Sequence, residues 1–260
     1  MSDLPRRSPR QSAPVLHGSL QLLHLDEHLA VVNKPAGWLV HASPIDRGER
    51  RIVLQALRDQ LGRAVWPLHR LDKGTSGALA FALDPDTART IGRAFDSGHG
   101  VRKTYRAIVR GWPGLEQLID HPLTRMADDQ SGSREPVQAA QTRLYRMRQG
   151  TVPIADQRHD QIRIAEVQLQ PLTGRRHQLR RHMKHIAHPI IGDATHGKGP
   201  LNRSLAAHLG VSRLWLHAAS LELPPIIDRP PIRVEAPSGD EWRVWDRLMM
   251  QPLETGMTKA

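Results

Sequence analysis

Residues 69–83 read HRLDKGTSGALAFAL, a polar loop that runs without a break into six apolar residues. An apolar run of this length is typical of a strand that is buried on both faces. Asp84 follows the run and can cap a helix that brings Ala88, Ile91 and Phe95 to one face. We therefore expect a polar loop to enter the centre of a sheet here, where it can hold a carboxylate rigidly.

Further elements are predicted on both sides of this stretch. Strands are expected over residues 29–33, 103–110, 137–147, 164–169 and 214–223. Helices are expected over residues 51–61 and 177–186, and loops over residues 126–136 and 149–160. Strands outnumber helices and do not alternate regularly with them, which indicates an α+β fold built around a largely antiparallel sheet.

Length and composition exclude several classes of protein. The chain has 260 residues and no cysteine, which excludes disulfides, thiolate zinc sites, iron–sulfur clusters and cysteine nucleophiles. Its longest apolar run, residues 78–83, is far shorter than the ~20 residues of a membrane span. No signal-peptide core follows the N-terminus, so the protein is expected to be cytoplasmic and to have no membrane partner.

The charge balance indicates a polyanionic partner. Lys and Arg together number 37 against 26 for Asp and Glu, a net charge of +11, and nucleic acid is the polyanion that such a balance favours. Residues 173–185, TGRRHQLRRHMKH, hold five Lys or Arg, three His and no acid. A passive solvated helix face is the alternative to a phosphate-binding one.

Two side chains are candidates for chemistry. Asp72 is a candidate acid, base or nucleophile, with Thr75, Ser76 and Gly77 supplying turn geometry and backbone hydrogen bonds. Its alternative is a salt bridge with a neighbouring basic residue of the same loop, Arg70 or Lys73. Tyr105 is a candidate general acid or base, and its alternative is a core tyrosine with a satisfied hydroxyl.

Two patterns that suggest cofactors are rejected. His182, His185 and His188 lie three residues apart, but no acid accompanies them and the spacing matches no zinc motif, so no metal is expected. Residues 192–199 mimic a phosphate-binding P-loop, yet Gly199 follows Lys198 where a P-loop needs Ser or Thr. No nucleotide and no other cofactor is expected.

Several segments together resemble the RluA-type pseudouridine synthases. They arrive in the order of that family, across residues 20–236. The matching segments are residues 32–41, 69–77, 103–112, 172–182, 188–193 and 214–218. Gly74 departs from the pattern, because the family often has proline there.

The resemblance implies a fold, a reaction and a site. The fold is the pseudouridine synthase fold, a mixed, mainly antiparallel sheet with flanking helices and a central catalytic cleft. The reaction detaches uracil at N1 and rejoins it through C5, without cofactor or metal. Asp72 would be the nucleophile or base, Tyr105 would stack on the base, and Arg180 would pair with Asp72. The residues expected to bind substrate are His69, Arg70, Leu71, Thr75, Ser76, Gly77, Lys103, Arg175, Arg176, His177, Gln178 and Leu216.

Within the family, residues 37–49 and 202–208 resemble the branch that modifies uridine 65 of tRNA. The expected partner is therefore tRNA, bound by a monomer. Ribosomal RNA as substrate and a non-catalytic RNA-binding protein remain as alternatives. We expect a disordered basic arm over residues 1–16, a catalytic domain over 17–252 and a tail over 253–260, with no S4-type RNA-binding domain.

Overall fold

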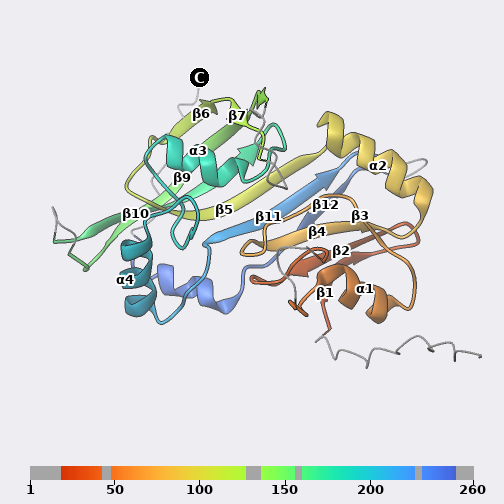
Figure 1. Ribbon diagram of the computed structural model, residues 1–260, viewed down its shortest axis with the longest axis horizontal. Coiled ribbons are helices and arrows are strands. Elements are labelled where there is room, and N and C mark those ends of the chain that lie inside the picture. The colour runs from red at the N-terminus through yellow and green to blue at the C-terminus, as the bar shows by residue number, and fades with distance from the viewer. Residues whose placement is uncertain (1–18, 43–47, 127–135, 156–159, 226–229, 250–260) are drawn as a thin grey trace, which may run out of the picture.

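The computed structural model describes residues 19–42, 48–126, 136–155, 160–225 and 230–249. The predicted arm and tail, and nearly all of the loop expected over 126–136, lie outside these residues. The described part forms an α+β fold around a ten-stranded sheet, as predicted (Figure 1). Within it, no helix combines the length and the apolar character that a membrane span requires.

Eight strands follow one another across the sheet. Their order is β1 (Gln21–Leu25), β2 (Leu29–Lys34), β4 (Ser76–Ala82), β11 (Leu216–Leu223), β5 (Arg102–Arg110), β10 (Ile162–Pro171), β9 (Gln141–Val152) and β6 (Glu116–Asp120). Strand β3 (Trp66–Pro67) pairs with β4, and β12 (Ile232–Glu235) with β11. Strands β7 (Leu123–Thr124) and β8 (Val137–Gln138) form a separate pair. Among the named strands, β4 and β11 alone run parallel, so the prediction of a mixed, mainly antiparallel sheet is confirmed.

Helices cover both faces of the sheet. Helices α1 (Val53–Leu61) and α3 (Gln178–His185) join a core cluster with residues of β4, β5 and β10. Helix α2 (Pro85–Ser97) packs through Ile91 onto the opposite face of β4. Helix α4 (Gly199–Leu209) and the 3₁₀ helix η1 (Asp240–Trp245) build a third cluster around Trp215. The predicted cap of α2 is confirmed, since the Asp84 carboxylate accepts the Thr87 N–H at 2.8 Å.

The parallel contact of β4 with β11 explains one glycine. Gly77 has φ +111°, and a Cβ placed there would lie 2.2 Å from the Ala218 carbonyl oxygen. A side chain would therefore separate the two strands at the point where the polar loop enters the sheet. All seven residues of β4 are buried, as the apolar run predicts.

Some of the predicted elements are wrong and others are missing. The strand expected over 137–147 is divided between β8 and β9. The loop expected over 149–160 is wrong at its start, because β9 continues to Val152, which pairs with Ile162 of the long strand β10. The sequence analysis also missed the edge strands β1 and β6, the short strands β3, β7 and β12, helix α4 and the 3₁₀ helix η1.

Candidate active site

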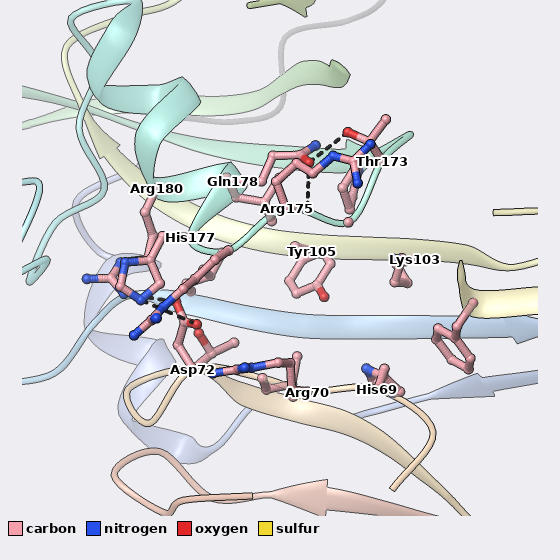
Figure 2. A pocket seen from close by; sticks show the side chains of 18 of the residues that line it. His69, Arg70, Asp72, Lys103, Tyr105, Thr173, Arg175, His177, Gln178 and Arg180 are labelled. Atoms are coloured by element: carbon pink, nitrogen blue, oxygen red, sulfur yellow. Dashed lines mark hydrogen bonds and ion pairs between the residues drawn. The ribbon is translucent and has the colours of Figure 1, made fainter. Parts of the chain in front are cut away.

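A pocket of about 530 Å³ opens where the loop before β4 faces β5 and the start of α3. It gathers the three predicted catalytic residues, Asp72, Tyr105 and Arg180. Figure 2 shows them around one cavity together with predicted substrate-binding residues such as His69, Lys103 and Gln178. The predicted binding residues that line it are His69, Arg70, Leu71, Thr75, Lys103, Arg175, Arg176, His177, Gln178 and Leu216.

Two of the predicted substrate-binding residues do not line this pocket. The Ser76 hydroxyl is buried, where it accepts a hydrogen bond from Arg213 Nη2 at 2.7 Å and lies 2.8 Å from His217 Nδ1. Gly77 lies at the contact of β4 with β11. Both residues anchor the loop to the sheet and leave Asp72 to face the cavity.

Asp72 belongs to a chain of ion pairs. Its Oδ2 accepts a hydrogen bond from Arg180 Nη1 at 2.8 Å, which confirms the predicted pair and replaces the alternative pairing with Arg70 or Lys73. Lys73 instead lies 3.3 Å from Glu49. Arg180 donates two further bonds, from Nε and Nη2, to the two oxygens of Asp193 at 2.8 Å each. The Arg180 guanidinium is thus held in one orientation by a two-pronged contact before it reaches Asp72.

Asp193 is a functional candidate that the sequence reasoning did not select. Its side chain is 1% exposed, and it also accepts the backbone N–H groups of Thr195 and His196 at 2.9 Å. Burial opposes ionisation of Asp193, but its bonds to Arg180 and to the backbone prevail and hold its pKa below the ordinary value. In residues 192–199, the segment that mimics a P-loop, two backbone N–H groups therefore donate to this carboxylate and not to a bound phosphate. Burial by itself would lower the pKa of Arg180, but the hydrogen bonds to Asp193 and Asp72 prevail and raise it.

Lys34 supports the Asp72 loop from beneath and was likewise not selected. It is fully buried, and its ammonium donates to the carbonyl oxygens of Pro35, Lys73 and Thr75 at 3.0, 3.1 and 2.6 Å. Burial lowers its pKa to about 7, while the charge of Asp72 favours the protonated form. The loop is closed by a hydrogen bond from the Thr75 N–H to the Asp72 carbonyl at 3.0 Å.

Tyr105 lies in the middle of the pocket, between Asp72 at one end and Lys103 with His69 at the other (Figure 2). The side chain is buried, and no hydrogen bond to the described residues engages its hydroxyl. Burial and the nearby charge of Asp72 raise the pKa of Tyr105. The phenol therefore stays protonated at neutral pH and offers the pocket a flat apolar ring.

His177 approaches Asp72 from the start of α3. It has φ +53°, a left-handed conformation that a non-glycine residue rarely adopts. Its Nδ1 lies 3.1 Å from His196 Nε2, and its Nε2 lies 3.8 Å from Asp72 Oδ1. Burial lowers the pKa of His177, although the charge of Asp72 opposes that shift.

Gln178 uses its amide on the protein. Its Oε1 accepts from the Thr173 hydroxyl at 2.7 Å and from the Arg175 N–H at 3.0 Å. Its Nε2 donates to the Gln141 carbonyl at 2.9 Å and to the Thr142 hydroxyl at 3.0 Å. Gln178 thus holds the loop that carries Arg175 along the pocket.

The three histidines of the rejected metal pattern have separate surroundings. His182 lies 2.9 Å from the Thr142 hydroxyl and 3.0 Å from the His121 carbonyl oxygen. His185 stacks on the His121 ring, and His188 Nδ1 lies 2.8 Å from the Arg110 carbonyl oxygen. Each ring therefore has a structural role of its own.

Comparison with known proteins defines the class. A family described as RNA pseudouridylate synthase matches residues 28–185, and the chain belongs to this family. The resemblance found in the sequence is thereby confirmed. A solved human protein, RNA pseudouridylate synthase domain containing 1, is 25% identical, with a TM-score of 0.72 and coverage of 94% of both chains.

Several curated relatives that match most of this chain share one name, tRNA pseudouridine synthase C. The relative from Yersinia pestis is 43% identical over 86% of this chain and 88% of its own length. That from Vibrio cholerae is 42% identical over 86% of this chain and 93% of its own length. For the relative from Pectobacterium carotovorum, at 42% identity, the match spans 60% of the relative's length.

Proposed function

We propose that this protein isomerises uridine to pseudouridine in tRNA, with Asp72 as the reacting carboxylate. The observation that carries the proposal is the hydrogen bond of Asp72 to Arg180, whose guanidinium is held in place by two further hydrogen bonds to Asp193. A carboxylate entering a cleft that excludes water tends to take up a proton, and an adjacent guanidinium opposes this. Asp72 is thereby held beside a fixed positive charge and aimed into the cavity.

The reaction sets what the other side chains have to do. Breaking the bond from N1 to the ribose and forming the bond from C5 leaves the composition of the RNA unchanged, so no electron or group carrier is consumed. Between the two steps the uracil must turn without leaving the enzyme. In our proposal the buried face of Tyr105 and the Leu216 side chain hold the freed base, as flat and apolar surfaces allow rotation without breaking a hydrogen bond.

The target nucleotide has to reach Asp72 from a folded RNA. Enzymes that act on a paired or stacked base extrude it into a pocket. Arg70 is exposed beside Asp72 on the pocket wall and is our candidate for filling the gap that the extruded base leaves. Arg175 and Arg176 line the same cavity and are assigned to the RNA backbone, to which cations bind without reading sequence.

The choice of tRNA rests on the shared name of the relatives, and uridine 65 on the resemblance of residues 37–49 and 202–208 to one branch of the family. We further propose that residues 17–252 act as one catalytic domain, as a monomer and in the cytoplasm. RNA binding then depends on this domain and on its positive charge, so affinity should fall as salt rises.

The experiment uses two folded tRNA transcripts that differ only at position 65. The transcript with uridine there should gain one pseudouridine at that position, and the transcript with cytidine should gain none. Mapping of pseudouridine in total RNA from cells that lack the protein should lose the same site. Modification of ribosomal RNA fragments with an untouched tRNA would overturn the substrate but not the reaction, and no pseudouridine in any RNA would overturn both.

A further inference from the structure

A cation that forms no ion pair with the described residues lies at the end of the pocket opposite Asp72. Lys103 is on β5, two residues before Tyr105, and its side chain is half-buried. Within the described residues, no hydrogen bond or ion pair engages its ammonium. Burial lowers the pKa of Lys103, as expected where a charge has lost water and gained no anion. An uncompensated charge in a pocket is costly unless a ligand supplies the missing partner.

His69 supplies a hydrogen-bond donor at the same end. Its Nε2 accepts the backbone N–H of Ala80 at 3.1 Å, so the proton of the neutral ring must be on Nδ1. Burial, with the charge of Lys103, lowers the pKa of His69 to about 3, and the ring is neutral at pH 7. Within the described part of the chain, Nδ1 has no hydrogen-bond partner, and it remains available to a ligand.

Phe95 brings these two groups together. The His69 ring stacks on Phe95 with centroids 4.7 Å apart and planes 13° apart. The Lys103 ammonium lies 5.9 Å from the centre of the same ring. Opposite them, Gly174 has no side chain, and a Cβ built there would come to 3.8 Å from Lys103 Nζ. Lys103 and His69 thus both lie against Phe95 and line the same end of the cavity, where Gly174 adds no side chain.

The pocket continues from this end into a second hollow. This hollow, of about 570 Å³, shares Phe95, Lys103 and Arg175 with the catalytic pocket and extends over Arg102 and Arg143. Its described lining therefore has four cationic side chains and a single acid, Asp96. A strand that leaves the catalytic pocket on this side meets positive charge first at Lys103 and then along the hollow.

We propose that Lys103 and His69 form a phosphate subsite, which holds a backbone phosphodiester of the RNA where the strand passes from the catalytic pocket to Arg102 and Arg143. The inference rests on the proposed function for the identity of the RNA. A phosphodiester presents only acceptors, and Lys103 Nζ and His69 Nδ1 are both donors, one of them charged. A nucleobase edge matches these two groups less well than a phosphodiester does. Some edges present donors as well as acceptors, and an edge that presents only acceptors carries too little charge to match an ammonium. The subsite therefore positions the strand without reading sequence.

The first test compares Lys103→Met with Lys198→Met. Methionine keeps the length of the lysine stem and removes its charge, and Lys198 is an exposed lysine that lines neither hollow. Binding of a fluorescent tRNA is measured by anisotropy across a series of salt concentrations. Lys103→Met should raise Kd about tenfold and lower the salt slope by about one, while Lys198→Met should leave both near wild type. Equal effects of the two variants would overturn the subsite.

The second test asks whether the ligand is a phosphate. Neutral methylphosphonate linkages replace the phosphates around the target uridine one at a time. One linkage should weaken binding to the wild type about tenfold and have no effect on Lys103→Met, because the partner is already missing. His69→Phe keeps the stacking on Phe95 and should reduce the effect of that same linkage. If the loss of affinity caused by Lys103→Met and the loss caused by a methylphosphonate simply added at every linkage, Lys103 would contact none of these phosphates.

Binding is measured without reference to turnover, so the two proposals fail separately. If the coupled linkage is found while the tRNA gains no pseudouridine, the subsite stands and the proposed function falls. If pseudouridine forms at the expected uridine and no linkage couples to Lys103, the function stands and the subsite falls.

Discussion

At one end of the pocket Asp72 pairs with Arg180, which Asp193 holds in turn, whereas at the other end Lys103 has no ion pair within the described residues. The supporting side chains of the first end are shielded from solvent, since Arg180 and Asp193 are 9% and 1% exposed, whereas Asp72, which faces the cavity, is 24% exposed. The charges there balance one another inside the protein. At the second end the balance is left to a ligand.

This difference separates two tasks that a single pocket performs. Charges that are paired within the fold have fixed positions before the substrate arrives. A reaction at one substrate atom requires such fixed positions. Charges left unpaired contribute to affinity when an anion arrives. Changes at the Asp72 end should therefore reduce rate at saturating enzyme, and changes at the Lys103 end should reduce binding.

The largest effect is expected from Asp72→Asn, which removes the charge and keeps the volume. The single-turnover rate of pseudouridine formation should fall at least 10³-fold, about 4 kcal/mol of barrier, with little change in the Kd for RNA. Asp96→Asn makes the same change at the opposite end of the pocket and should keep the rate. Near-normal turnover by a folded Asp72→Asn protein would falsify the assignment of Asp72 as the reacting carboxylate. The proposed division of tasks between the two ends of the pocket would then fall as well.

Asp193→Asn tests whether the locked arginine matters to Asp72. The variant leaves Arg180 with weaker support, so the rate should fall about 100-fold. The free energy of unfolding should fall by about 3 kcal/mol in urea denaturation, because a buried charge loses a partner. Asp86→Asn disrupts an exposed pair with Arg89 and should cost less than about 1 kcal/mol. If Asp193→Asn lowered stability and left the rate of the folded protein unchanged, Asp193 would have no part in positioning Asp72.

Lys34 gives the Asp72 end a distinct pH dependence of stability. Its pKa is about 7 in the folded protein and 10.5 ordinarily, so between these values the unfolded chain binds more protons. Stability should then rise with pH, by about 1 kcal/mol per pH unit between pH 7.5 and 9.5. Urea denaturation of the wild type and of Lys34→Met should give free energies that diverge by this amount. Parallel pH curves would contradict the assignment of a neutral Lys34 at high pH.

The smallest effect is expected from His177. Burial keeps its pKa below the ordinary value, so it is neutral at pH 7 and gains a proton only on acidification. The charges that face it are Asp72, Arg180, Arg176 and the ring of His196. A protonated His177 would compete with Arg180 for the Asp72 carboxylate, and the single-turnover rate should fall a few-fold toward pH 5. His177→Asn should flatten this acid limb, and His24→Asn on β1 should not; an unchanged limb in both variants would exclude His177.

The sequence predicted the site through residues that stand next to one another. Asp72 was a candidate because a polar loop precedes a wholly apolar strand, and the resemblance to a family selected it over the salt-bridge alternative. Asp84 was predicted because a capping residue precedes a helical pattern. Arg180 was placed by the resemblance to a family. Asp193 was not readable in this way, since only the folded chain brings its carboxylate to a guanidinium 13 residues earlier.

Two further features, the buried Lys34 and helix α4, were missed although the sequence contains a signal for each. Lys34 stands in a segment that resembles the family, but lysine is so commonly exposed that its burial beneath the loop could not be inferred. Helix α4 carries Leu201, Leu205 and Leu209 at helical spacing and is followed by Gly210, yet the segment was weighed only as a P-loop mimic and no helix was predicted there. Strand β6 had little signal, because it is an edge strand with a single buried side chain, Ile119.

The position of β11 has a consequence for the order in which this protein can be made. The strand lies between β4, which follows the Asp72 loop, and β5, which carries Tyr105, yet its residues, Leu216–Leu223, leave the ribosome long after both. Until they emerge, a growing chain has no strand to join the two halves of the sheet. Contacts this distant in sequence are slow to form. The pocket therefore assembles last, and a nascent chain stalled before Leu216 already carries its positive charge while it still lacks a site for chemistry.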